Sequence, residues 1–139
     1  MNNKLLEEQD LALMPGFVDD EKTEYKIEDL NRFIADKNNL GFIARDDKRI
    51  LAFAFGYVLT HPDGEKVFYL DAIDVIKEVQ GRGIGTDLMS YVRDHVRSIG
   101  CREMFLFTNQ SNSSARKCYE RSGAIKEADD AVLYVYSFE

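Results

Sequence analysis

The sequence is poor in the residues that mark several protein classes. Two prolines among 139 residues argue against a collagen-like rod, and 45% hydrophobic with 31% charged residues argues against a disordered chain. Cys101 and Cys118 lack CxxC spacing, and His61 and His95 stand apart along the chain. We therefore expect no metal site, reduced structural thiols and surface histidines.

Long apolar runs are also missing. None approaches the length that spans a bilayer, and the N-terminus reaches Glu7 and Glu8 too early for a secretory signal peptide. We expect a cytoplasmic protein without a membrane partner. Residues 1–139 are sufficient for one globular domain with its own core.

Positive charge is scarce, and the net charge is −7. Residues 1–40 hold 10 acidic residues against 5 basic ones. Such a field repels nucleic-acid phosphates and attracts cations, so we expect no nucleic-acid partner and favour a cationic substrate. The alternative is that the acidity serves solubility alone.

Hydrophobic periodicity predicts an α+β domain. Residues 1–20 are hard to place; Leu5 and Leu6 suggest a short strand, and residues 10–14 suggest a helical turn. Helices are expected over 26–37, 84–99 and 112–121, and strands over 40–45, 50–59, 67–75, 104–108 and 132–138. The apolar run 104–108 is typical of a strand buried on both faces. A ligand is expected at the carboxyl end of the strand that ends near Val75.

A glycine-rich turn follows that strand. Gly81, Gly83 and Gly85 alternate just before the helix, which leaves backbone N–H groups uncovered at its positive end. This pattern suits a pyrophosphate, although a purely structural connection is the alternative. The spacing does not match the dinucleotide G-x-G-x-x-G fingerprint, and Thr86 is not preceded by the lysine of a Walker loop.

Two motifs carry a resemblance to a known family. The run Gln80–Gly85 is similar to the Q/R-x-x-G-x-G/A motif of the GNAT superfamily of acyl-CoA-dependent N-acetyltransferases, and Asn112–Gly123 resembles its N-x-x-A-x-x-x-Y-x-x-x-G signature. The resemblance spans roughly residues 40–139. It implies the GNAT-like acyl-CoA N-acyltransferase fold, a central mixed, mostly antiparallel sheet flanked by helices. Segments 72–75, 103–112 and 129–136 look most like the aminoglycoside 3-N-acetyltransferase-like group.

The resemblance implies acetyl-CoA as cosubstrate and no metal. Main-chain N–H groups of the turn would bind the pyrophosphate, and the strand end would pair with the pantetheine arm, with the Val75 N–H polarising the thioester carbonyl. Asn112 would bind the same arm or serve as a helix N-cap. The cofactor-binding set is Ile73, Asp74, Val75, Gln80, Gly81, Arg82, Gly83, Ile84, Gly85, Thr86, Asn109 and Asn112.

Three side chains are candidates for catalysis. Tyr119 stands where the family places the phenol that protonates the departing thiolate; the alternative is a core tyrosine. Asp71 and Asp74 are candidates for the base that takes the proton of the amine, or hydrogen-bonding groups of the strand. The two positions are three residues apart, so on a regular strand their side chains point to opposite faces. Only one would then face the substrate unless a bulge intervenes. Ala72 stands where the group often carries an acid.

These features predict an acetyl-CoA-dependent N-acetyltransferase. Direct attack in a ternary complex would acetylate a primary amine of a small cationic substrate, aminoglycoside-like amines first. The alternatives are a protein or polyamine N-acetyltransferase, and a coenzyme A-binding module without turnover. The sequence leaves monomer and homodimer open, and antiparallel edge strands are compatible with a homodimer.

Overall fold

A computed structural model describes residues 1–138 and contains one five-stranded sheet in the order β1-β2-β3-β4-β5. The strands are β1 (Asn2–Leu5), β2 (Asn39–Arg45), β3 (Ile50–Thr60), β4 (Lys66–Val75) and β5 (Met104–Phe105). The first four pair antiparallel and β5 pairs parallel to β4. The predicted mixed, mostly antiparallel sheet is confirmed.

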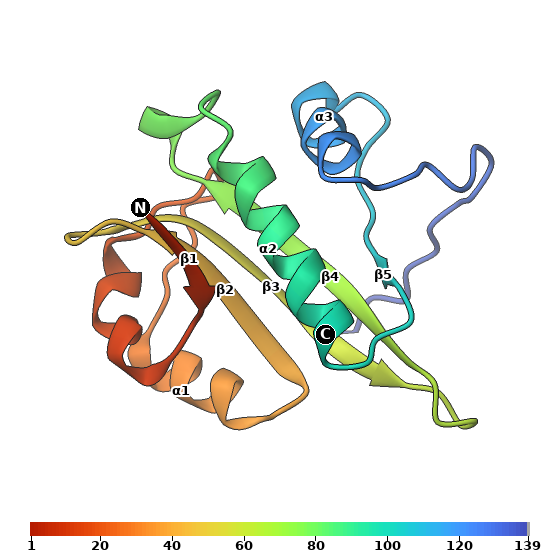
Figure 1. Cartoon of the computed structure of the whole chain (residues 1–139), viewed down its shortest axis with the longest axis horizontal. Coiled ribbons are helices and arrows are strands. Elements are labelled where there is room, and N and C mark those ends of the chain that lie inside the picture. Colours follow the sequence, from red (N-terminus) through yellow and green to blue (C-terminus); the bar gives the residue numbers. More distant parts are fainter. Residues whose placement is uncertain (139) are drawn as a thin grey trace.

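The helices cover both faces of this sheet. They are η1 (Glu8–Gly16), α1 (Ile27–Ala35), η2 (Lys77–Val79), α2 (Ile84–Ser98) and α3 (Ser113–Arg121). Figure 1 shows α2 lying along the sheet, η1 and α1 near β1 and β2, and α3 beyond β4. None of the helices in residues 1–138 is long and apolar enough to cross a membrane.

The strand register separates the two faces. On one, Phe42 packs edge-on against Phe68 and against Tyr91 of α2. On the other, Phe55 contacts the ring of Phe33 from α1, and its neighbour Phe53 is in a T-shaped contact with Tyr25. Fully buried apolar side chains on the α2 face form most of the core.

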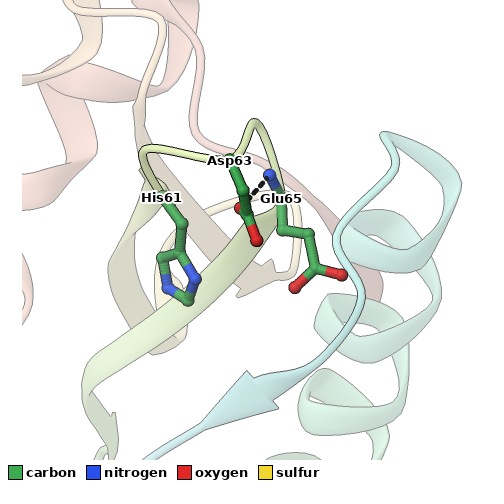
Figure 2. Close-up of side chains that lie close together, drawn as sticks. All are labelled: His61, Asp63 and Glu65. Carbon is green, nitrogen blue, oxygen red and sulfur yellow. Dashed lines mark hydrogen bonds between the residues drawn. The ribbon is translucent and has the colours of Figure 1, made fainter.

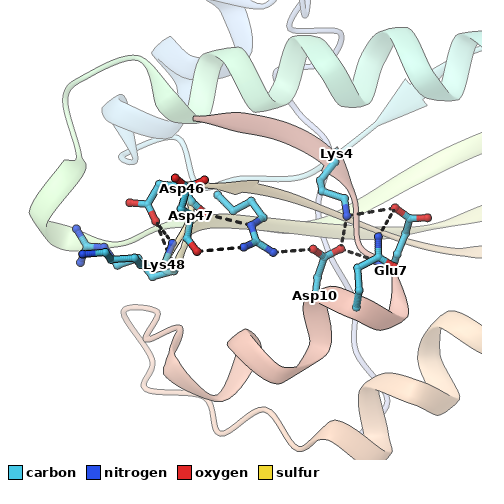
Figure 3. Close-up of polar contacts among 9 residues, drawn as sticks. Lys4, Glu7, Asp10, Asp46, Asp47 and Lys48 are labelled. Atoms are coloured by element: carbon cyan, nitrogen blue, oxygen red, sulfur yellow. Dashed lines mark hydrogen bonds and ion pairs between the residues drawn. The ribbon is translucent and has the colours of Figure 1, made fainter.

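A buried carboxylate ties the N-terminal segment to the sheet. The side chain of Asp10 in η1 is 1% exposed, and it accepts hydrogen bonds from Lys4 Nζ at 2.6 Å and from Arg45 at 3.0 Å. The Glu7 N–H donates a third at 3.0 Å, as Figure 3 shows. Burial alone would raise the pKa of Asp10, but these bonds outweigh it and hold the pKa below its ordinary value.

The short strand and the helical turn suggested within residues 1–20 are present as β1 and η1, and Asp10 anchors this segment to the sheet. Two predictions about the strands are wrong. Strand 104–108 is shortened to Met104–Phe105, and Phe107 is 71% exposed rather than buried on both faces. No strand forms over 132–138, although the residues alternate, because an alternating segment needs a ladder and β5 offers only two residues.

Candidate active site

The turn after β4 requires glycine at two positions. Gly81 and Gly83 have φ values of 81° and 82°, in the left-handed region that other residues adopt only with strain. A Cβ atom on either would meet no atom within 4 Å, so conformation and not space selects glycine. Gly83 is also the N-cap residue of α2.

The amino end of α2 presents unpaired donors. The first intrahelical bond runs from Asp87 N to Gly83 O at 3.0 Å, and no side chain caps the helix. The N–H groups of Ile84, Gly85 and Thr86 precede that bond, so they are available at the positive end of the helix dipole. The sequence-based interpretation as an anion cradle matches this geometry.

Gly85 has a different role, since it lets three elements approach closely. A Cβ atom there would lie 3.3 Å from Val75 Cγ2 and 3.5 Å from Cys118 Sγ. The end of β4, the start of α2 and the middle of α3 therefore meet at this residue. A larger side chain would separate α3 from the strand.

A cleft of about 380 Å³ opens where these elements meet. Most of the sequence-predicted site residues line it: Ile73, Asp74, Val75, Gln80, Gly81, Gly83, Ile84, Gly85, Thr86, Asn112 and Tyr119. The end of β4, the turn and α3 thus contribute to one continuous surface. Its other lining residues are Asp20, Val79, Ser114, Ala115, Lys117, Cys118 and Arg121.

Sequence reasoning missed the two basic residues of this wall. Lys117 and Arg121 lie four residues apart on α3 and both line the cleft. Their four-residue spacing puts both on one side of α3, but each is two residues from Tyr119, so the position of Tyr119 gave no signal for them. These cations face the same cleft as the uncapped end of α2, which makes the cleft suited to phosphates.

Three predicted residues do not line the cleft. Arg82 is exposed on the turn. The carbonyl oxygen of Asn109 accepts a hydrogen bond from Asn112 N at 3.0 Å, so its main chain shapes the entry to α3. Asp71 lies further back along β4, and its side chain is exposed.

Asn112 has the N-cap role that was one of its two interpretations. Its Oδ1 atom accepts a hydrogen bond from the Ala115 N–H at 3.2 Å and another from the Ser114 hydroxyl at 3.4 Å. Only the carbonyl oxygen is used for capping. The Nδ2 group is left as a donor at the border of the cleft.

A β-bulge in β4 changes the faces of the two aspartates. Phe55 pairs with Ala72 and Gly56 with Leu70, so Asp71 is an extra residue without a partner on β3. The extra residue places Asp71 and Asp74 on the same face, that of α1, despite their opposite parity. Gly56 permits the bulge, because a Cβ atom there would clash with the Tyr69 carbonyl oxygen.

Asp74 is a half-buried carboxyl group with acidic surroundings. Burial, followed by the negative charges of Asp19, Asp20 and Glu21, raises its pKa to about 6. Such a group is ionised near neutral pH and still binds a proton readily. It has the properties of a general base in a cleft.

Tyr119 lies across the cleft on α3 and packs against the core. Burial, then Cys118, then the charge of Asp74 raise the pKa of its phenol. The hydroxyl group is therefore protonated over the physiological range and can donate a proton or a hydrogen bond. The residue is partly buried against the core and also lines the cleft, so its catalytic role stays a prediction.

β4 and β5 diverge beside the cleft. They pair only between Phe68 and Met104 and between Tyr69 and Phe105. From residue 70 onward, the edge of β4 that faces away from β3 has no strand partner within residues 1–138. An extended chain can therefore add alongside Ile73 and Val75 in the manner of a strand.

The structure also groups three residues outside the cleft. His61, Asp63 and Glu65 at the tip of the β3–β4 hairpin have ligand atoms within 4.8 Å of one another, and Figure 2 shows them side by side. All three are exposed, and Glu65 also pairs with Arg102 at 3.1 Å. His61 thus has neighbours that its isolation in the sequence did not indicate.

Sequence comparison agrees with the geometry. The model of the Acetyltransferase (GNAT) family matches residues 5–124. Mycothiol acetyltransferase from Saccharopolyspora erythraea is 31% identical over 81 residues, which are 58% of this chain and 26% of that protein. The chain thus spans about a quarter of the length of this curated relative.

Solved structures share the fold. An aminoglycoside acetyltransferase from an uncultured soil metagenomic sample, in complex with sisomicin, superimposes with a TM-score of 0.82 at 20% identity, over 99% of this chain and 96% of that one. An aminoglycoside N-acetyltransferase in complex with CoA gives 0.77 at 21% identity, over 98% and 99%. The motifs, the fold and the family match lead to one conclusion: this chain belongs to the acetyltransferase (GNAT) family.

Proposed function

We propose that the protein transfers an acetyl group from acetyl-CoA to a primary amine of a small cationic substrate, by direct attack in a ternary complex. One observation carries the proposal. A single cleft joins the uncapped end of α2 to a carboxyl group of raised pKa, Asp74, and to a protonated phenol, Tyr119. An anion site, a base and an acid are the groups that this reaction needs.

Several groups would hold the cosubstrate. The N–H groups of residues 83–86 would bind its pyrophosphate, with Lys117 and Arg121 adding positive charge. The main chain of residues 73–75 would pair with the pantetheine arm, and Asn112 Nδ2 would donate to it. Gln80 Nε2 donates to Val75 O at 2.9 Å, which fixes the turn to the end of the strand.

The reaction follows from these positions. The Asp74 carboxylate takes a proton from the substrate ammonium, directly or through water, and the amine nitrogen attacks the thioester carbonyl, whose oxygen the Val75 N–H polarises. The C–N bond forms as the C–S bond breaks, and Tyr119 gives its proton to the sulfur. The second proton that the amine nitrogen loses on becoming an amide then restores the Tyr119 phenol. Asp74 remains protonated until the proton passes to water.

The acidic surroundings of the cleft support a cationic acceptor. Asp19, Asp20 and Glu21 act on Asp74 through their charge, and Asp20 lines the cleft itself. We favour aminoglycoside-like amines, since a protein of the same fold is named an aminoglycoside acetyltransferase and was crystallised with sisomicin. The relative named mycothiol acetyltransferase points to other small acceptors.

A panel of amines tests this proposal. Release of coenzyme A thiol from acetyl-CoA is measured with sisomicin, a polyamine and a peptide amine. Release with at least one amine is expected, and Tyr119→Phe should slow turnover more than it weakens cofactor binding. Thiol release from none of them, with coenzyme A binding intact in calorimetry, would favour a binding module without turnover.

We also propose a homodimer formed through the C-terminal segment. Large apolar side chains there are 72–91% exposed: Ile125, Val132, Leu133, Tyr134, Val135, Tyr136 and Phe138. Each copy carries this strand-like segment, so the segments of two copies can pair with each other about a two-fold axis. Sedimentation should give a dimer that Leu133→Ser with Val135→Ser converts to a monomer; a monomeric parent would contradict the proposal.

A further inference from the structure

We propose that Asp71 binds a second ammonium group of the acceptor, so that substrates with two or more cationic nitrogens, such as polyamines or aminosugars, are preferred to monoamines. This inference rests on the proposed function, in which Asp74 receives the reactive amine. It gives Asp71 the role of a specificity-determining residue in place of a second candidate base.

The carboxylate of Asp71 retains capacity for a cation. The hydroxyl groups of Tyr57 and Tyr69 donate to its two oxygens at 3.3 Å and 3.5 Å, which is long for O–H···O bonds. A carboxylate has about four lone-pair positions, so these two contacts leave room for N–H donors. None of the ion pairs within residues 1–138 includes Asp71 or Asp74.

The two tyrosines that donate to this carboxylate belong to a cluster of aromatic rings. The ring of Tyr69 stacks on that of Phe105 with centroids 5.2 Å apart, and the ring of Phe107 lies 6.2 Å from the ring of Tyr69. Tyr57 lies 6.3 Å from Tyr69 on the other side. Such rings contact the methylene groups of an amine and attract its cationic nitrogen through their faces.

The spacing of the two aspartates sets the length of the acceptor. Asp74 lies three positions after Asp71, which at about 3.3 Å per residue corresponds to roughly 10 Å or less, because the bulge shortens the path. Because the bulge turns both side chains to one face, a single extended diamine can reach both. A monoamine can occupy only the Asp74 position.

Cadaverine and pentylamine test this inference, because they have the same carbon chain and differ in the second nitrogen. Cadaverine should have the lower KM, and Asp71→Asn should raise that KM about tenfold or more, toward the KM of pentylamine. Asp71→Glu should restore part of the preference. Asp47→Asn, on the exposed β2–β3 turn, is the matched control and should change neither substrate.

Calorimetry with coenzyme A-saturated protein separates the two proposals. If no amine is acetylated, yet cadaverine binds more tightly than pentylamine and loses that advantage in Asp71→Asn, the diamine site stands and the proposed reaction falls. Acetylation of both amines with equal KM in the parent protein would overturn the diamine site alone. An equal loss for both amines in Asp71→Asn would do the same.

Discussion

Asp74 on β4 and Tyr119 on α3 face one cleft, and the charge of the aspartate is among the causes that raise the pKa of the tyrosine, after burial and Cys118. The pair therefore holds opposite protonation states near neutral pH. The carboxyl group is ready to accept a proton while the phenol retains one.

This relationship predicts the pH dependence of turnover. Asp74 works as a base only when ionised, so kcat/KM should rise with pH through about 6 and level off above it. Asp74→Asn should lower kcat/KM about a hundredfold or more and remove the step near pH 6. Rates measured between pH 5 and 8 in both proteins would contradict the assignment if both profiles were flat.

The same substitution should stabilise the protein. The pKa of Asp74 rises on folding from 3.8 to about 6, so its ionised form destabilises the folded state above pH 6. Asp74→Asn should raise the free energy of unfolding at pH 7.5 by about 1 kcal/mol, because solvent screens a half-buried group. Urea titrations should show the gain shrinking as the pH falls from about 6 to about 4, and vanishing below that, where Asp74 is protonated in both states. Equal stability at pH 7.5 would exclude the shift.

Asp10 should have the opposite effect on stability. Asp10→Ala should lower the free energy of unfolding by about 2–3 kcal/mol at pH 7. The substitution leaves Lys4 and Arg45 without this partner. Because their side chains are 22% and 23% exposed, the loss is smaller than for a fully buried unpaired charge. Because folding lowers the pKa of Asp10 from 3.8, its contribution is present above that value and is lost as the pH falls through the folded pKa.

Asp47→Ala is the control for Asp10, since Asp47 is an exposed turn residue. Chemical denaturation of both variants at several pH values is the measurement. A difference between Asp10→Ala and the parent that persists unchanged at pH 2 would show that packing, and not charge, accounts for the loss.

Gly83→Ala tests the turn. An alanine at φ 82° should reduce stability by about 1–2 kcal/mol and weaken coenzyme A binding severalfold by shifting the N–H groups of α2. Gly16→Ala is the matched control, because no atom lies within 4 Å of its added Cβ and its φ is not left-handed. Calorimetry with coenzyme A should separate the two variants, and similar binding by both would argue against a pyrophosphate site at this turn.

Local patterns predicted the elements near the cleft well. The spacing of Ile84, Leu88 and Val92 gave the start and the buried face of α2, and the glycine turn fell where the cleft lies. The two GNAT motifs placed Tyr119 on the wall of the same cleft. These features depend on residues close in sequence, which is why they could be predicted.

Features that depend on distant residues could not be predicted. The bulge at Asp71 arises from the register against Gly56, and the place of η1 depends on Asp10 meeting Arg45, 35 positions away. The alternation over residues 132–138 indicated a strand, but pairing needs a neighbouring ladder that no local pattern can supply.

Under the role proposed for Asp71, the one-residue bulge would let acceptor choice change without altering the cleft. The segment from Ala72 to Val75 keeps its register with β3 whatever happens at the extra residue, so the carboxyl group at the reaction centre stays in place. A relative with this residue deleted would lose the outer carboxylate while retaining the inner one. Homologues should therefore differ in the number of charged nitrogens they accept according to the length of this strand alone.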